Sequence, residues 1–482
     1  MKRPIFRFML LAALLFGSGV RAKITLPSVF SDNMVLQQNA SAPVWGEAEP
    51  CAKVKLTASW DGKHYTTRAD AQGRWRMDIE TPTAGGPYSL TVSDGDKLVL
   101  ENVMIGEVWL CSGQSNMEMP FIGWGKPDNY EQEIAAADHP SIRLLHVEHV
   151  TAARPRQDVK VRDGGWQICS PATIPSFSTT AYFFGRELAE ALDVPIGLIH
   201  SSWGGTDIEP WIDADCLRMI PEFVEGINAV RSAADDVKIG PQTGSALYNA
   251  MIAPLVPYAI RGAIWYQGEN NVSRAWRYRD LFPLLITSWR QKWGVDFPFY
   301  FVQLTAFTEQ LPEPGESEWA ELREAQARTL AVANTGMAVI IDKGSATDIH
   351  PKDKQTVGKR LALLARAQTY GENVPCSGPA YASHRIAGDK IVVSFAHADG
   401  GLQTLDGERL KGFAVAGYDH KFHWAEARID GDCVVVRSPE VPFPIAVRYG
   451  WANNPDCNLF NGAGLPASPF RTDDWRGCTR ND

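Results

Sequence analysis

The spacing of hydrophobic residues changes twice along the chain, at about residue 105 and again at about residue 373. Before the first change, apolar and polar residues alternate over short runs such as Gly73–Ile79, which predicts β-strands. Turn sequences such as Asp61-Gly62 and Asp94-Gly95 separate these runs at intervals typical of a β-sandwich. Residues 23–104 are therefore expected to form an N-terminal β-sandwich domain.

The middle of the chain, residues 105–372, alternates short apolar runs with segments of helical periodicity. This alternation predicts a parallel sheet covered by helices on both faces, a three-layer α/β/α domain. The expected strands are Ile105–Cys111, Ile142–Val147, Ile196–Ser201, Arg261–Gln267, Phe297–Leu304 and Met337–Asp342. The expected helices are Asn129–Ala137, Ala181–Leu192, Trp276–Trp293, Trp319–Val332 and Lys354–Thr369.

Residues 373–482 return to strand-like runs such as Lys390–Phe395 and Cys433–Val436, with Gly and Asp turns between them. A second β-rich domain is expected here. The two β-rich segments flank the α/β domain, which permits a sheet shared between them.

The first 22 residues have the pattern of a secretory signal. Three positive charges precede an apolar run over residues 8–20, and Val20-Arg21-Ala22 is a small-x-small cleavage site. The run is too short to span a membrane, and no later stretch approaches the ~18 apolar residues that a span needs. We therefore expect cleavage near Ala22 and a periplasmic or secreted protein.

Charge and cysteine content narrow the function classes. The formal net charge is −9, and removing the leader's four positive charges would make it −13, which argues against nucleic acid and anionic membranes as partners. The eight cysteines contain no C-x-x-C pair, so no zinc site is indicated. Cys457 and Cys478 form a candidate disulfide in the C-terminal tail.

The strongest chemical signal is the segment that follows the first α/β strand, Ser112-Gly113-Gln114-Ser115-Asn116. Glycine permits a sharp turn, and the carboxyl ends of strands carry the chemistry of open α/β sheets. Ser115 is the candidate nucleophile, which needs a base and donors for a developing oxyanion. The structural alternative is that Ser115 only caps a helix.

Three later segments offer the missing partners. His200–Asp207 contains two glycines after a strand, and the Gly205 N–H is a candidate oxyanion donor. Ala263–Asn271 ends in amides and a carboxylate, of which Gln267, with Asn270 in reserve, could donate an N–H. The loop Thr347–Pro351 supplies His350 as base and Asp348 as its orienting acid. Each segment also has a purely structural interpretation: an ordinary turn for the first, a capped helix start for the second and a structural histidine for the third.

Together these segments resemble the SGNH (GDSL-like) hydrolase superfamily, and the chain is similar to the sialate O-acetylesterase family of carbohydrate esterases. The resemblance rests on G-Q-S-N-M (113–117), W-G-G-T (203–206), W-Y-Q-G-E-N-N (265–271) and D-I-H-P (348–351). The opening L-P-S-V-F-S-D-N-M-V-L-Q (26–37) and the tail R-Y-G-W-A-N-N-P (448–455) extend it over nearly the whole mature chain.

The resemblance implies Ser115 as nucleophile, His350 as base and Asp348 as acid. It also implies an oxyanion hole made by the N–H groups of Ser115 and Gly205 and by an amide side chain. The chain departs from the superfamily in two places. The superfamily's acid lies three residues before its histidine, where this chain has Thr347, and its third-block Asn is replaced by Gln267. A Ser-His dyad, or Asp342 as the acid, therefore remains open.

The expected activity is release of acetate from sugar hydroxyls, without a metal or other cofactor. The expected substrate-binding residues are Gln114, Asn116, Trp203, Trp211 and Glu269. The two tryptophans are included because aromatic faces pack well against sugar rings. O-acetylated sialic acid is the first substrate that the resemblance implies. Acetylated xylan or another plant glycan is the alternative within the class, and a carbohydrate-binding protein with a silent hydrolase site is the alternative outside it.

Overall fold

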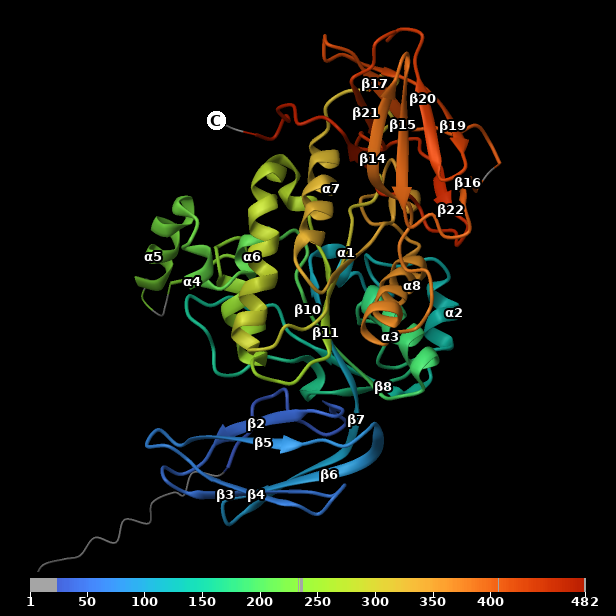
Figure 1. The fold of residues 1–482 in the computed structure, drawn as a ribbon. Coiled ribbons are helices and arrows are strands. Elements are labelled where there is room, and N and C mark those ends of the chain that lie inside the picture. Colours follow the sequence, from blue (N-terminus) through green and yellow to red (C-terminus); the bar gives the residue numbers. More distant parts are fainter. Residues whose placement is uncertain (1–23, 233, 235–236, 406, 481–482) are drawn as a thin grey trace, which may run out of the picture.

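The computed structural model describes residues 24–480 except 233, 235–236 and 406. The predicted leader, residues 1–22, lies outside the described residues. Three regions follow one another along the long axis of the molecule: N-terminal strands, a central α/β region and C-terminal strands (Figure 1). None of the helices in the described part of the chain is both long and apolar enough to cross a bilayer.

The N-terminal region is all-β and ends in a strand that continues into the centre of the molecule. The first half of β7 pairs antiparallel with β6, and its second half, from Glu107 to Gly113, lies between β10 and β11 in the central sheet. β7 thus runs across the boundary predicted at residue 104. The strands are β1 (Val35–Gln37), β2 (Ser41–Glu47), β3 (Lys53–Ala58), β4 (His64–Arg68), β5 (Arg74–Glu80), β6 (Gly85–Ser93) and β7 (Lys97–Gly113).

The central sheet has the order β13-β12-β11-β7-β10-β8-β9, and its strands are parallel except for β9 at one edge. Strands β10, β11 and β12 are buried along their whole length, which explains the apolar sequences of β11, β12 and residues 196–199 of β10. The strands are β8 (His139–His146), β9 (Gln167–Cys169), β10 (Ile196–Ser202), β11 (Gly262–Tyr266), β12 (Phe299–Val302) and β13 (Thr335–Ala338).

Helices cover both faces of this sheet, with α3 and α8 on one side and α6 and α7 on the other (Figure 1). The α-helices are α1 (Ser115–Glu118), α2 (Tyr130–Ala135), α3 (Thr179–Leu192), α4 (Ala214–Leu217), α5 (Val224–Ser232), α6 (Ala275–Trp293), α7 (Glu318–Arg328) and α8 (Lys354–Leu364). The 3₁₀ and π segments are η1 (Arg162–Gly164), η2 (Glu209–Trp211), η3 (Pro221–Phe223), η4 (Tyr248–Ile252), η5 (Ala253–Leu255), η6 (Glu269–Arg274), η7 (Thr329–Ala331), η8 (Ile341–Lys343) and η9 (Ala365–Thr369). The three-layer α/β/α prediction is confirmed.

The C-terminal strands form sheets of their own, so the sheet expected to be shared with the N-terminal strands does not exist among the described residues. The sheets are β14-β15-β20-β19, β18-β17-β21-β23 and the pair β16-β22. Their strands are β14 (Ala380–Ala387), β15 (Lys390–Ala396), β16 (Leu402–Thr404), β17 (Phe413–Ala416), β18 (Phe422–Trp424), β19 (Glu426–Asp430), β20 (Cys433–Arg437), β21 (Ala446–Tyr449), β22 (Leu459–Asn461) and β23 (Phe470–Arg471).

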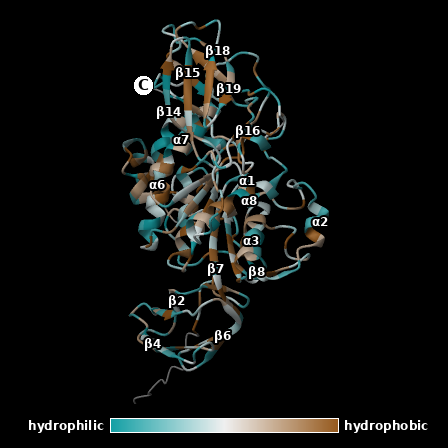
Figure 2. Ribbon diagram, turned by 45° about the vertical axis from the view of Figure 1, so that its right-hand side comes forward, coloured by the Kyte–Doolittle hydropathy of each residue, from teal (hydrophilic) through white to brown (hydrophobic). Residues whose placement is uncertain are grey.

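Two hydrophobic cores explain this division. One buried cluster runs without interruption from the N-terminal strands through the α/β region, and a separate cluster lies between the C-terminal sheets. The hydrophobic colouring in Figure 2 accordingly gathers on the central strands and again on β15 and its neighbours. Burial of apolar surface therefore fuses the first two regions, and the third is attached by other contacts.

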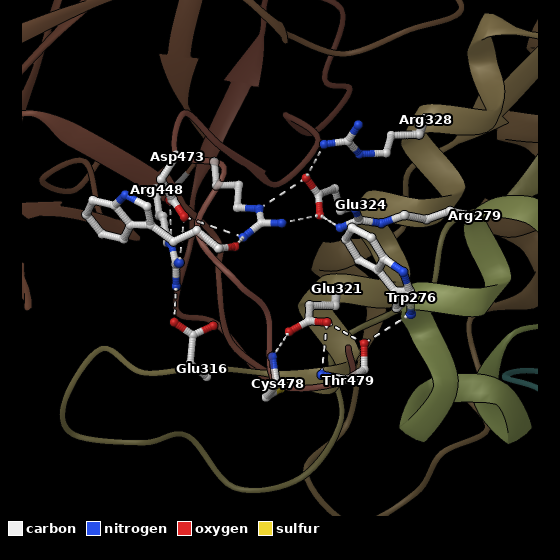
Figure 3. Close-up of polar contacts among 12 residues, drawn as sticks. Trp276, Arg279, Glu316, Glu321, Glu324, Arg328, Arg448, Asp473, Cys478 and Thr479 are labelled. Carbon is white, nitrogen blue, oxygen red and sulfur yellow. Dashed lines mark hydrogen bonds and ion pairs between the residues drawn. The ribbon is translucent and has the colours of Figure 1, made fainter. Parts of the chain in front are cut away.

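Polar contacts attach the C-terminal region to α6 and α7 (Figure 3). The Glu324 carboxylate on α7 binds Arg471 at 3.1 Å, and Glu321 accepts hydrogen bonds from the chain at Cys478 and Thr479. Arg448, 2% exposed, makes a two-pronged contact with Asp473. Buried charges need such partners, so this network fixes the orientation of the C-terminal sheets on the α/β region.

The cysteine prediction is wrong for the tail. Cys457 and Cys478 both carry free thiols. Cys457 packs against the C-terminal core, where burial raises its pKa to about 12, and the backbone N–H of Cys478 donates to Glu321. Polar contacts, not a disulfide, therefore hold the tail.

Candidate active site

The candidate nucleophile lies where β7, the middle strand of the central sheet, ends. Gly113 has φ +142°, and a Cβ there would lie 2.1 Å from the Tyr266 carbonyl oxygen, so only glycine allows β7 and β11 to approach this closely. The chain then turns into α1, of which Ser115 is the first residue. A helix's first N–H groups have no carbonyl partner within the helix, so the Ser115 N–H is placed to serve an oxyanion.

His350 reaches Ser115 from a loop 235 residues further along the chain. Its Nε2 lies 2.9 Å from the Ser115 Oγ, which is hydrogen-bond distance. On the other side of the ring, Nδ1 lies 3.3 Å from Asp348 Oδ1, and the same oxygen accepts the His350 backbone N–H at 2.9 Å. The structure thus brings serine, histidine and aspartate together in the order that base-assisted attack requires.

Electrostatics favour a neutral imidazole and an ionised carboxylate. Burial, then the positive charge of Lys354, lowers the pKa of His350 below its ordinary value of 6.5, although Asp348 opposes this. Partial burial tends to raise the pKa of Asp348, but hydrogen bonds from the His350 N–H and from Lys352 outweigh it, and the pKa of Asp348 is lowered. A neutral imidazole is the form that accepts the serine proton.

The lowered pKa of His350 predicts the acid limb of the pH profile. Protonation inactivates the base, so kcat/KM should fall with decreasing pH only as the pH passes through a pKa below 6.5. Hydrolysis of p-nitrophenyl acetate between about pH 4 and 8 measures this limb. An inflection above 6.5 would contradict the assignment of His350 as the base.

A buried polar network joins the nucleophile turn to the histidine loop. The Asn116 amide donates to Glu269 Oε1 at 2.6 Å and to the Ile349 carbonyl at 3.1 Å, and its Oδ1 accepts from the Lys354 ammonium at 2.7 Å. Burial raises the pKa of Glu269 and lowers that of Lys354 to about 7. Asn116 and Glu269 were expected to bind substrate, but this network uses the whole Asn116 amide. The network thereby links the nucleophile turn to the histidine loop.

The glycine turn of residues 203–206 lies against the nucleophile. A Cβ on Gly204 would come within 3.2 Å of the Ser115 Cβ, and the Gly204 N–H donates to Glu118 Oε2 at 2.5 Å. Gly205 has φ +71°, and a Cβ there would meet no atom within 4 Å. Open space therefore adjoins the Gly205 Cα, and Glu118 on α1 holds the turn.

The two candidate amide donors, Gln267 and Asn270, differ in how many of their amide hydrogens are already hydrogen-bonded. Both amide hydrogens of Gln267 are used inside the protein, on the Thr206 carbonyl at 3.2 Å and on Asn271 Oδ1 at 2.7 Å. Asn270 is exposed and donates one amide hydrogen to Asp207, which leaves the other free. The arrangement favours Asn270, the residue held in reserve, over Gln267 as the amide donor.

Asn270→Ala should therefore lower kcat by about 10²- to 10³-fold if its amide holds the oxyanion. The KM should change little, because such a contact strengthens in the transition state. Steady-state kinetics on p-nitrophenyl acetate measure both constants. An unchanged kcat would remove Asn270 from the oxyanion hole.

The side chains of the other three expected substrate-binding residues, Gln114, Trp211 and Trp203, differ in how far they are exposed to solvent. Gln114 is buried, and its Oε1 accepts the N–H groups of Gly268 and Asn270, so it shapes the Asn270 turn. Trp211 is fully buried and donates to Thr206 Oγ1, so substrate does not reach it. Trp203 is part-exposed and stacks on His149 at 4.3 Å.

An aromatic residue that sequence reasoning missed is Trp124. It is 50% exposed, and its ring lies edge-on to that of His350 at 5.2 Å. The signal for it was an aromatic residue between two glycines, nine residues after Ser115. As for metals, the described residues hold no group of three or more His, Cys, Asp or Glu side chains placed to bind an ion.

Comparison with known proteins adds to this geometry. The family described as "carbohydrate esterase, sialic acid-specific acetylesterase" matches residues 105–366. Sialate O-acetylesterase of Homo sapiens is 30% identical over 92% of this chain and 91% of its own length, and that of Rattus norvegicus is 29% identical over 97% and 98%. A carbohydrate acetylesterase from Xanthomonas citri has a crystal structure that matches with a TM-score of 0.86, at 42% identity over 94% of this chain and 100% of its own.

Proposed function

The chain belongs to the sialic acid-specific acetylesterase family of carbohydrate esterases and is a carbohydrate O-acetylesterase, and from this premise we propose that it deacetylates O-acetylated sialic acid by a Ser115-His350-Asp348 mechanism. The observation that carries the mechanism is the 2.9 Å contact between Ser115 Oγ and His350 Nε2. The observation that favours the sugar is the family match over residues 105–366.

In the first half of the reaction, His350 Nε2 takes the Ser115 proton while Oγ attacks the acetyl carbonyl carbon. Negative charge develops on the carbonyl oxygen, where the N–H groups of Ser115 and Gly205 and the Asn270 amide stabilise it. The tetrahedral intermediate collapses, and the sugar hydroxyl leaves with the proton from His350. In the second half, His350 takes a proton from water, whose oxygen attacks the acetyl-serine carbonyl carbon. The C–Oγ bond then breaks, acetate leaves, and His350 returns the proton to Ser115 Oγ.

Asp348 orients the imidazole in this proposal. Asp342, the alternative acid, makes a two-pronged contact with Arg360 at 2.6 and 2.9 Å. We expect Asp348→Asn to lower kcat/KM by about 10²- to 10³-fold, because an amide neither fixes the imidazole tautomer nor stabilises the imidazolium. Asp342→Asn should leave kcat/KM within about twofold while lowering the thermal midpoint. Kinetics and melting curves of both variants decide, and the opposite pattern of kinetics would make Asp342 the acid.

Substrate choice is tested by acetate release from three substrates: p-nitrophenyl acetate, O-acetylated sialic acid and acetylated xylan. Release from O-acetylated sialic acid with the highest kcat/KM is the expected result. A higher kcat/KM on acetylated xylan would make xylan the substrate in place of sialic acid and would leave the proposed mechanism unchanged. Binding of these sugars without any release would favour the binding-protein alternative.

We further propose that the protein acts outside the cytoplasm, in the periplasm or after secretion, with residues 1–22 removed. The support is the charged and apolar pattern of these residues. N-terminal sequencing of protein recovered from the extracellular or periplasmic fraction is expected to begin at Lys23. A first residue of Met1 would contradict the proposal.

A further inference from the structure

A groove on the outer face of the C-terminal sheet concentrates positive charge in an acidic protein. It has a volume of about 370 Å³, and its lining includes Lys390, Arg409, Arg428 and Arg437, with Glu426 as the one carboxylate among its described residues. The chain as a whole carries a net charge of −9. We call these five residues the basic groove.

The alternation of β15, β20 and β19 creates this face. Ile391, Val393, Val434 and Val436 point into the C-terminal core, so the residues between them point outward. Val392 and Arg428 both stand opposite Val435, and Glu426 stands opposite Arg437. The strands therefore line up the charged side chains beside a short apolar floor.

The cations of the basic groove are only loosely engaged. Glu426 is shared by Arg437 at 3.0 Å and by Arg409 at 3.6 Å, and Arg428 contacts Asp430 at 3.2 Å. Arg409, Arg428 and Arg437 have side-chain exposures of 66%, 69% and 60%. Exposed ion pairs contribute little free energy, so a ligand carboxylate can replace these partners at small cost.

An aromatic surface continues the basic groove. A second hollow of about 480 Å³ shares Arg409 and Glu426 with it and is also lined by Trp424 and Leu311. Trp424 is 41% exposed, and its indole N–H donates to the Pro312 carbonyl at 2.7 Å, which fixes the ring. A fixed, exposed indole beside arginines suits a sugar ring that carries a negative charge.

One loop connects this surface to the active site. Residues 303–317 follow β12, and Phe307 forms a β-bridge with Ser345, whose hydroxyl accepts the Asp348 N–H at 3.3 Å. Further along the same loop, Leu311 and Pro312 meet the Trp424 surface. The carboxyl ends of the central strands and α1 also face the C-terminal sheets (Figure 1). A glycan chain held on the C-terminal region therefore lies on the side of the molecule that contains Ser115.

We propose that the basic groove, with Trp424, is a second carbohydrate-binding site that holds carboxylate-bearing glycan chains while the active site deacetylates them. The acidic nature of the glycan rests in part on the proposed sialate substrate. The charge of the groove supports it independently, because its lining carries four cations and one carboxylate, and Asp430 beside Arg428 adds only a second carboxylate. A neutral glycan would gain nothing from that excess.

The test is binding of polysialic acid that carries no acetyl groups, measured by calorimetry on the full chain. Arg428→Glu should weaken binding by at least about tenfold, since one charge-assisted contact becomes a repulsion. Trp424→Ala should also weaken it. Lys97→Glu is the control, because it makes the same charge reversal at an exposed position on the N-terminal region. Salt screens the interaction between this distant charge and the glycan, so the affinity should stay within about twofold of the wild type. All three variants should hydrolyse p-nitrophenyl acetate like the wild type.

Equal binding by Arg428→Glu and the wild type would overturn the proposal, as would equal affinity for unacetylated xylan or tighter binding of single-stranded DNA. Hydrolysis of monomeric O-acetylated sialic acid separates this result from the proposed function. If the monomer is not hydrolysed but polysialic acid binds through Arg428, the sialate proposal fails and the second site stands. If the monomer is hydrolysed but Arg428→Glu binds normally, only the second site fails.

Discussion

Ser115→Ala is expected to lower kcat by about 10⁴- to 10⁶-fold, because the variant lacks the oxygen that forms the acetyl-enzyme. Substrate affinity should survive, since the Gly205 turn, the exposed Trp124 and the part-exposed Trp203 do not depend on the Ser115 hydroxyl. Acetate release under single-turnover conditions measures the loss. Mass spectrometry of the wild type during turnover should also show an acetyl group on the peptide that contains Ser115.

The matched control is Ser112→Ala, three residues earlier on β7. Ser112 is fully buried, and its hydroxyl has no hydrogen-bond partner within the described part of the chain. The same loss of one oxygen atom should leave kcat within about twofold there, as for most substitutions away from a site. Retention of wild-type kcat by Ser115→Ala, or an equal loss in Ser112→Ala, would show that Ser115 is not the nucleophile.

His350→Ala is the second large effect, with an expected fall in kcat of about 10⁴-fold or more. The serine hydroxyl then has no base at 2.9 Å, and the leaving sugar oxygen has no proton donor. The acid limb of the pH profile should disappear with the imidazole. Kinetics across the same pH range as for the wild type measure both effects.

The double variant Ser115→Ala/His350→Ala provides the control for His350. Members of one catalytic unit are not additive, so the double variant should be no slower than the slower single variant. Multiplicative losses would mean that His350 acts independently of Ser115. A His350→Ala protein with a lowered thermal midpoint and normal kcat would reduce His350 to a structural role.

The local sequence determined most of the α/β fold and the identity of the candidate catalytic trio. Strands buried on both faces must be continuous apolar runs, so β10, β11 and β12 are visible in the sequence. Ser115 and His350 stand in short motifs beside glycine, proline and a helix start, which mark turns at strand ends. These signals depend on neighbours along the chain, and no tertiary information is needed to read them.

Only the tertiary structure shows which polar side chains of the site are already hydrogen-bonded within the protein. Gln267 and Asn270 are both amides in one loop. Only the packing of η6 shows that the Gln267 amide donates hydrogen bonds to Thr206 and Asn271. Asn116 was expected to contact substrate, and only the fold shows that its amide contacts Lys354 and Glu269, which are distant in sequence. The partners of Asn116 lie 153 and 238 residues away in sequence, and contacts at such separations leave no local pattern.

Trp211 and Trp124 show the same limit for aromatic residues. Trp211 stands beside a glycine motif but packs inside, and Trp124 stands outside the four motifs but lies against His350. The sequence by itself thus determined the fold class and the strand ends, and it indicated Ser115, His350 and Asp348 as catalytic candidates, since each of these signals lies in neighbouring residues. Only the tertiary structure decided which amide, which tryptophan and which face of the C-terminal sheet remain open to a ligand, because exposure depends on what the rest of the chain covers.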